Sequence, residues 1–128
     1  MVKISILVFL HLVADFLLQG SYFSKLKATK ITYLLLHVLI YTLLFVILSP
    51  LLLSLTFTQG LIFSGINGGI HLVVDFLTSK LKQKFWQKNE SIYVAIITLD
   101  ALIHIAVLIA TYIYIFPEAF NTILNLGT

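Results

Sequence analysis

HLVADFL at residues 11–17 and HLVVDFL at residues 71–77 are nearly the same segment, occurring twice in one chain. Each segment places a histidine four residues before an aspartate within an otherwise apolar run. Residues four apart on a helix lie on one face, with their Cβ atoms about 5–6 Å apart. We therefore expect the histidine and the aspartate of each segment to point in the same direction from an apolar helix.

The composition predicts a membrane protein. The chain has 128 residues, of which 60% are hydrophobic and 10% are charged, and its mean hydropathy is +1.08. Soluble domains contain about 25% charged residues. A chain of this length corresponds to one domain. It has no cysteine, so neither a disulfide nor a thiolate ligand is available.

Four apolar stretches predict four transmembrane helices, at residues 2–20, 31–49, 60–79 and 92–116. Each approaches or exceeds the ~20 apolar residues that cross a hydrocarbon core about 30 Å thick. Pro50 is expected to end or kink the second helix, because proline lacks the backbone donor and clashes with the preceding turn. Residues 51–55 then either continue that helix or lie along the membrane interface.

The repeated segment divides the predicted domain into two halves. Residues 11–19 and 71–79 are identical at six of nine positions. We therefore predict an all-α polytopic fold in which residues 1–128 form a single four-helix transmembrane domain. Its two tandem helical hairpins, about 1–58 and 59–128, are expected to be related by a pseudo-twofold axis along the membrane normal.

The lysines predict the orientation in the membrane. Seven of the eight basic residues lie in two short stretches, residues 25–30 and 80–88, and the loop at residues 49–59 carries no charge. Cytoplasmic loops are enriched in lysine and arginine. We expect both basic loops in the cytoplasm and both termini outside, with the lysines setting topology and contacting anionic membrane lipid. Loops this short are not expected to bind nucleic acid.

Every histidine and every aspartate lies in a predicted span: His11, Asp15, His37, His71, Asp75, Asp100 and His104. At about 1.5 Å per residue, all seven fall between the cytoplasmic interface and just past the membrane midplane. Ionisable groups within the membrane are costly and indicate a functional site. Imidazole and carboxylate ligands favour a divalent metal, Zn²⁺ first and Mn²⁺ or Fe²⁺ as alternatives. Seven groups can bind one or two ions.

Further polar and small residues extend the predicted site. Asn67, one turn before the second histidine–aspartate segment, and Gln19, one turn after the first, are expected to line it. Gly65 and Gly69 form a small-residue pair expected to pack against another helix, and Gly68 is expected to allow a close helix approach beside the site. The half of the bundle beyond the site is expected to be plain hydrocarbon.

The residues leave several classes of function open. The first is a metal-dependent hydrolase acting on a lipid or amphiphile near the cytoplasmic leaflet, with Asp15, Asp75 or Asp100 as a catalytic general base. The second is a divalent-metal transporter or sensor, and a homodimer is expected for either. The third is a structural or partner-binding subunit with a fixed metal or haem. Metal-free His–Asp hydrogen bonding is the structural alternative.

The motifs also carry a resemblance. HLVADFLLQ at residues 11–19, His37, HLVVD at 71–75 and Asp100-x-x-x-His104 resemble the small bacterial membrane proteins of the domain of unknown function 3307 family, over essentially the whole chain. The family's usual Asp-Gln pair is Asp100-Ala101 here. The resemblance implies a bacterial cytoplasmic membrane protein and no activity. A looser likeness, in topology and buried histidines, to bacterial membrane-bound metal-dependent hydrolases favours hydrolysis by analogy.

Overall fold

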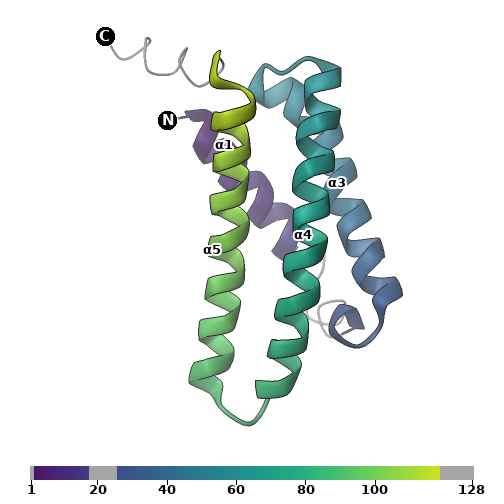
Figure 1. Cartoon of the computed structure of the whole chain (residues 1–128), viewed down its shortest axis with the longest axis vertical. Helices are drawn as coiled ribbons and strands as arrows, with labels where there is room; N and C mark the ends of the chain where they lie inside the picture. Colours follow the sequence, from purple (N-terminus) through teal and green to yellow (C-terminus); the bar gives the residue numbers. More distant parts are fainter. Residues whose placement is uncertain (1, 18–25, 119–128) are drawn as a thin grey trace.

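The computed structural model describes residues 2–17 and 26–118, and the regular structure in those ranges is helical throughout. Its elements are α1 (Val2–Leu12), the π-helix η1 (Val13–Leu17), α3 (Ile31–Leu53), α4 (Phe57–Phe85) and α5 (Glu90–Ile115) (Figure 1). Residues 26–29 add one short helical turn before α3. The all-α prediction is confirmed.

Three of these helices, α3, α4 and α5, are long and apolar enough to cross a membrane. They contain 23, 29 and 26 residues respectively, which at ~1.5 Å per residue exceeds a hydrocarbon core about 30 Å thick. The first predicted span differs, because α1 contains 11 residues and passes into η1. Its last predicted residues, 18–20, lie outside the described ranges. The described residues therefore establish three membrane-length helices and not four.

Pro50 does not end the second predicted span. It lies inside α3, which continues to Leu53. Its ring packs on Gly60 of α4, where an added Cβ would lie 2.6 Å from the Pro50 Cγ atom. The glycine thus makes room for the proline ring at the point where the two helices approach each other.

The third predicted span is longer than expected, and α4 continues into the second lysine stretch and ends at Phe85. At its start, the Thr56 side chain accepts a hydrogen bond from the Gln59 N–H, and the Gln59 side chain accepts one from the Thr56 N–H. This reciprocal capping box stabilises the first turn. At its other end, lysines are good helix formers, so the expected basic loop is mostly helix.

The elements are arranged as a ring in which α4 packs against α3 and α5, and α1 packs against the same two helices (Figure 1). The beginning of α1 and the end of α5 lie at one end of the bundle. Residues 26–30 and 86–89 lie towards the other end, which we call the basic end.

Gly68, and not the pair Gly65 and Gly69, makes the close approach near the centre of α4. An added Cβ at Gly68 would clash with the Thr42 side chain of α3. Gly65 and Gly69 are exposed, and an added Cβ there would have nothing within 4 Å. The prediction for Gly68 is confirmed. The prediction that the other two pack against a helix is wrong for the described part of the chain, because they point to the opposite face.

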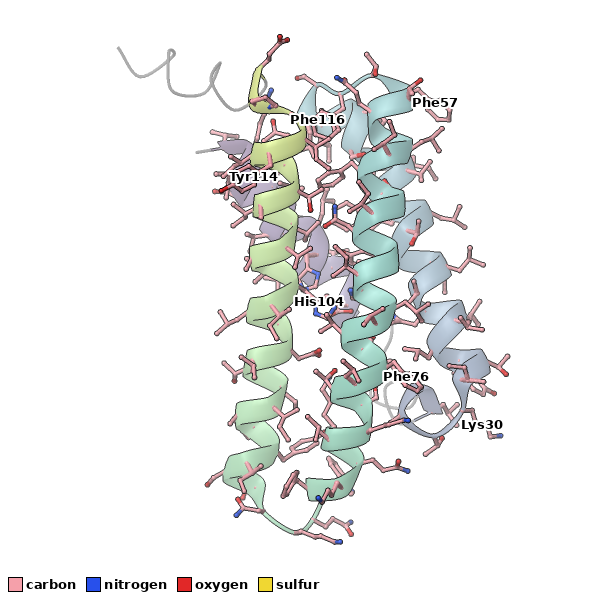
Figure 2. The ribbon with its side chains drawn as sticks, viewed as in Figure 1. Lys30, Phe57, Phe76, His104, Tyr114 and Phe116 are labelled. Atoms are coloured by element: carbon pink, nitrogen blue, oxygen red, sulfur yellow. The ribbon has the colours of Figure 1, made fainter. Side chains whose placement is uncertain are left out.

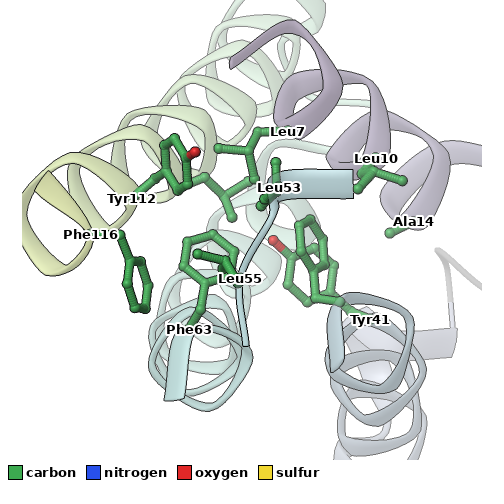
Figure 3. Close-up of a cluster of buried hydrophobic side chains, with 11 residues drawn as sticks. Leu7, Leu10, Ala14, Tyr41, Leu53, Leu55, Phe63, Tyr112 and Phe116 are labelled. Carbon is green, nitrogen blue, oxygen red and sulfur yellow. The ribbon is translucent and has the colours of Figure 1, made fainter. Parts of the chain in front are cut away.

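The apolar core lies between the level of the buried histidines and the end of the bundle where α1 begins. Figure 3 shows its aromatic and aliphatic side chains converging from α1, α3, α4 and α5. The cluster consists of Leu7, Leu10, Ala14, Tyr41, Phe45, Leu53, Leu55, Phe63, Leu108, Tyr112 and Phe116.

Buried polar groups also occur in this half of the bundle. Ser49 and Ser64 are completely buried, and neither hydroxyl has a hydrogen-bond partner in the part of the chain that the structure describes. Asn67 donates to the Phe63 carbonyl at 2.8 Å and accepts from the Thr111 hydroxyl at 3.4 Å. The prediction of plain hydrocarbon beyond the site is therefore wrong.

Candidate metal centre

Four histidines from four elements meet in the interior: His11 of α1, His37 of α3, His71 of α4 and His104 of α5. Each is at most 3% exposed. The ring centroids are 4.1 Å apart for His71 and His104, and 4.9 Å apart for His37 and His71. Figure 2 shows His104 pointing from α5 into the bundle, about midway along its length. The predicted convergence of the four histidines is present.

Two aspartates join this cluster. The Asp15 Oδ1 atom lies 3.1 Å from the His37 Nε2 atom and 3.4 Å from the His71 Nε2 atom. The Asp75 Oδ2 atom lies 3.0 and 3.6 Å from the same two nitrogens, which are 2.8 Å from each other. Ligand atoms about 2.0–2.1 Å from a tetrahedral ion are separated by about 3.3 Å. These five separations are therefore close to those between ligand atoms of one metal ion.

Asp15 is carried by the π-helical segment η1 rather than by a continuous α-helix. Single π-helical turns widen the backbone and are frequent at functional sites. The Asp15 Oδ2 atom nevertheless lies 3.7 Å from the His11 Nε2 atom. His11 and Asp15 are therefore close together, as expected, although Asp15 lies in a π-helix and not in a continuous α-helix.

Three overlapping ligand groups can be drawn in the cluster. In each, the three candidate ligand atoms lie within 4.8 Å of one another. The groups are Asp15–His37–His71, His71–Asp75–His104 and His11–Asp15–His104. Because every pair of groups shares a residue, the arrangement fits one ion, or two neighbouring ions with a shared ligand.

Several ligand atoms of the cluster are buried without a hydrogen-bond partner among the described residues. They include both ring nitrogens of His11, the His71 Nδ1 atom, the His104 Nε2 atom and one carboxylate oxygen of Asp75. An unsatisfied buried polar atom costs about 1–3 kcal/mol. This many unpartnered buried atoms in one cluster require an explanation, such as a bound ion or water.

A hydrogen bond of His104 determines which of its two ring nitrogens can bind a metal. Its Nδ1 atom lies 2.8 Å from the backbone carbonyl oxygen of Asp100, one turn earlier in α5. A ring nitrogen facing a carbonyl must donate its proton there, which leaves the other nitrogen as the acceptor. The unpartnered Nε2 atom of His104 is therefore the one available to a metal.

The Asp100 carboxylate is placed differently from the other two. It accepts hydrogen bonds from the Thr78 hydroxyl at 2.7 Å and from the Lys82 ammonium at 2.5 Å. It belongs to none of the three ligand groups in the described chain. The ligand groups thus contain six of the seven predicted residues. The Asp100 carboxylate lies beside them, with its Oδ1 atom 3.7 Å from the His104 Nδ1 atom.

Lys27 is the residue that sequence reasoning missed. Its side chain is 9% exposed, and its ammonium donates to the Asp75 Oδ2 atom at 2.9 Å. The same ammonium lies 3.2 Å from the His37 Nε2 atom. Lys27 therefore has a contact inside the protein that was not expected from the sequence, and so does Lys82, whose ammonium pairs with the buried Asp100. Their role in topology stays a prediction.

Nothing in the sequence distinguishes Lys27 from the other lysines nearby, so its place in the site could not have been predicted.

A second neighbour of the site, Tyr41, could have been predicted from the sequence. It lies four residues after His37 and therefore on the same face of α3. Its ring stacks on that of His71. Asn67 contacts Phe63 and Thr111 rather than a ligand group, and Gln19 lies outside the described residues.

Comparison with known proteins agrees with the sequence motifs. The family model described as "Protein of unknown function (DUF3307)" matches residues 4–126, nearly the whole chain. This confirms the family resemblance. No curated protein and no solved structure matches the chain.

Proposed function

We propose that this chain, which belongs to the DUF3307 family, is a membrane-embedded metalloprotein that holds one or two divalent ions, Zn²⁺ first and Mn²⁺ or Fe²⁺ as alternatives. The observation that carries the proposal is the group of buried ring nitrogens, together with one carboxylate oxygen, that lack hydrogen-bond partners in the described chain. An ion bound among them would satisfy several of these atoms at once. It would also offset the cost of keeping two aspartates in a membrane interior.

The ligands of the first ion would be His37 and His71, with Asp15 and Asp75 completing the shell. A second ion would use His11 and His104 and share the Asp15 carboxylate. This division takes the Asp15–His37–His71 and His11–Asp15–His104 groups and adds Asp75, whose Oδ2 atom lies 3.0 Å from the His37 Nε2 atom. It leaves His104 oriented by its Nδ1 hydrogen bond, as histidine ligands usually are.

Within this proposal the activity is hydrolysis of a lipid or other amphiphile. A bound divalent ion supplies an activated water at neutral pH and polarises the group that is cleaved. In the form of the site in which only one of Asp15 and Asp75 binds the metal, the other would accept the proton of the attacking water. Asp100 would act as a positioning residue, since its carbonyl orients His104. Basic residues at the basic end would attract anionic headgroups.

The proposed setting is the bacterial cytoplasmic membrane, with residues 2–20 as a fourth span. The halves 1–58 and 59–128 would be two hairpins related by a pseudo-twofold axis, with the termini outside and the basic end in the cytoplasm. Support comes from the repeated segments, each of which contributes one histidine and one aspartate to the same cluster. A homodimer is part of the same proposal.

The experiment is elemental analysis of protein purified in mild detergent without chelator. One or two equivalents of Zn, Mn or Fe are expected. The paired variants His37→Ala and His71→Ala should lose metal, whereas Gln83→Ala, at an exposed position of α4, should retain it. Less than a tenth of an equivalent, with no uptake on titration, would overturn the proposal. A Soret absorption band would instead indicate the haem alternative.

A divalent-metal transporter or sensor is the second candidate, and one observation favours it. Buried polar side chains continue beyond the cluster, towards the end of the bundle where α1 begins, through Asn67, Ser64 and Ser49. A transporter needs polar groups on both sides of its binding site. Saturable metal flux into proteoliposomes that disappears in Asp15→Asn and Asp75→Asn variants would favour transport. Retention of metal against external chelator, without flux, would favour the hydrolase.

A further inference from the structure

The Lys27 side chain points the opposite way from a typical lysine near the end of a membrane helix. Such lysines extend their ammonium groups to the water interface. Thr29 and Lys30, which follow in the same short connection to α3, are exposed. Lys27 instead directs its ammonium inward, where it contacts Asp75 and His37. Its four-carbon stem is flexible, and exposed residues follow it within three positions.

The two atoms that the ammonium contacts are the same atoms proposed to bind a metal. The Lys27 Nζ atom is 2.9 Å from the Asp75 Oδ2 atom and 3.2 Å from the His37 Nε2 atom. The His37 Nε2 atom also lies 3.0 Å from the Asp75 Oδ2 atom and 3.1 Å from the Asp15 Oδ1 atom, and a ring nitrogen that faces a carboxylate donates its proton there. The acceptor atom for which the ammonium and a metal would compete is therefore the Asp75 Oδ2 atom. Two cations this close would also repel each other strongly in a medium of low dielectric constant.

Resting on the proposed metal site, we propose that the Lys27 ammonium is an internal competitor for the metal. In the metal-free protein it compensates the Asp75 carboxylate. Metal binding displaces the ammonium from the Asp75 Oδ2 atom towards the exposed side of the connection before α3. The affinity of the site for metal therefore depends partly on the free energy of breaking the Lys27–Asp75 ion pair.

The second buried lysine pair marks the limit of this effect. Lys82 contacts Asp100, which belongs to none of the ligand groups of the described residues. Its ammonium does not share an acceptor atom with the proposed metal. Of these two lysines, only Lys27 is expected to change its contacts when metal binds.

The experiment compares Zn²⁺ binding to the full-length wild type and to Lys27→Met, which keeps the length of the side chain and removes its charge. Lys27→Met should bind Zn²⁺ at least tenfold more tightly. Lys30→Met is the matched control, since Lys30 is exposed and lies three residues away. Its affinity should stay within twofold of the wild type. Circular dichroism of each variant verifies that the helical fold is retained.

A second measurement uses the wild type alone, so that it does not depend on the folding of a variant. A water-soluble amidination reagent modifies lysines, and mass spectrometry gives the rate at each position. Saturating Zn²⁺ should raise the rate at Lys27 at least fivefold and leave the rate at Lys30 unchanged.

The outcomes separate the two proposals. If the wild type binds Zn²⁺ but labelling of Lys27 is unchanged and Lys27→Met binds no more tightly, the competition is overturned and the metal site remains. If neither the wild type nor Lys27→Met binds Zn²⁺, both are overturned. Tighter binding by Lys27→Met together with faster labelling in the wild type would support the competition.

Discussion

The rings of Tyr41 and His71 are stacked across the interface between α3 and α4, with centroids 4.0 Å apart and planes inclined by 13°. Both side chains are buried. Because the tyrosine follows His37 by one turn of α3, the contact fixes the orientation of one imidazole relative to another. A ring held in place before binding loses less conformational freedom when it binds a ligand.

This stacking predicts a role for the Tyr41 ring in metal affinity. Tyr41→Leu should weaken Zn²⁺ binding by about tenfold, the lower end of the effect seen when groups supporting metal ligands are removed. Tyr41→Phe keeps the ring and should bind within about twofold of the wild type by the same reasoning. Competition titration with a fluorescent chelator measures both affinities. Equal binding by all three proteins would contradict a positioning role.

The two repeated histidines are expected to differ in importance. His71 belongs to two of the three ligand groups, and His11 belongs to one. His71→Ala should therefore lose the ion held by His37 and His71, and all metal if the site holds only that ion, whereas His11→Ala should keep that ion. Metal content per protein after gel filtration tests this. Asn67→Ala removes a buried polar side chain one turn away and should keep its metal, which separates loss of a ligand from loss of stability.

Adjacent glycines provide a test of helix packing. Gly68→Ala should destabilise the protein by about 1–3 kcal/mol, the usual cost of overpacking, because the new methyl group would clash with Thr42. Gly69→Ala should be neutral or slightly stabilising, since its face of α4 is open and alanine is the better helix former. Thermal unfolding in detergent compares the two variants. A loss of stability confined to Gly69→Ala would contradict the observed packing.

The parts of the site that depend on local patterns were predictable. Hydropathy over about 20 residues locates α3, α4 and α5, and the four-residue spacing places His71 and Asp75 on one face. The depth of the histidines follows from helix rise. These signals need only neighbouring residues and the thickness of a membrane, so they can be read without the tertiary structure.

The remaining features depend on which helices meet. Lys27 lies in a connection with no periodic pattern, and its inward direction follows from the position of Asp75 on another helix. The Asp100 carboxylate lies outside the ligand groups because it accepts hydrogen bonds from Thr78 and Lys82. The choice between Gly68 and Gly69 likewise depends on where α3 packs. None of these relationships is encoded in the spacing along one helix.

The proposed topology can be tested with single cysteines, because the chain has none of its own. Thr58 and Gln83 are exposed near opposite ends of α4, and replacing either leaves every lysine in place. With the basic end in the cytoplasm, Thr58→Cys should react with a membrane-impermeant maleimide in intact cells. Gln83→Cys should react only after permeabilisation. The reverse pattern would invert the orientation and move the proposed access to the metal site to the outer face of the membrane.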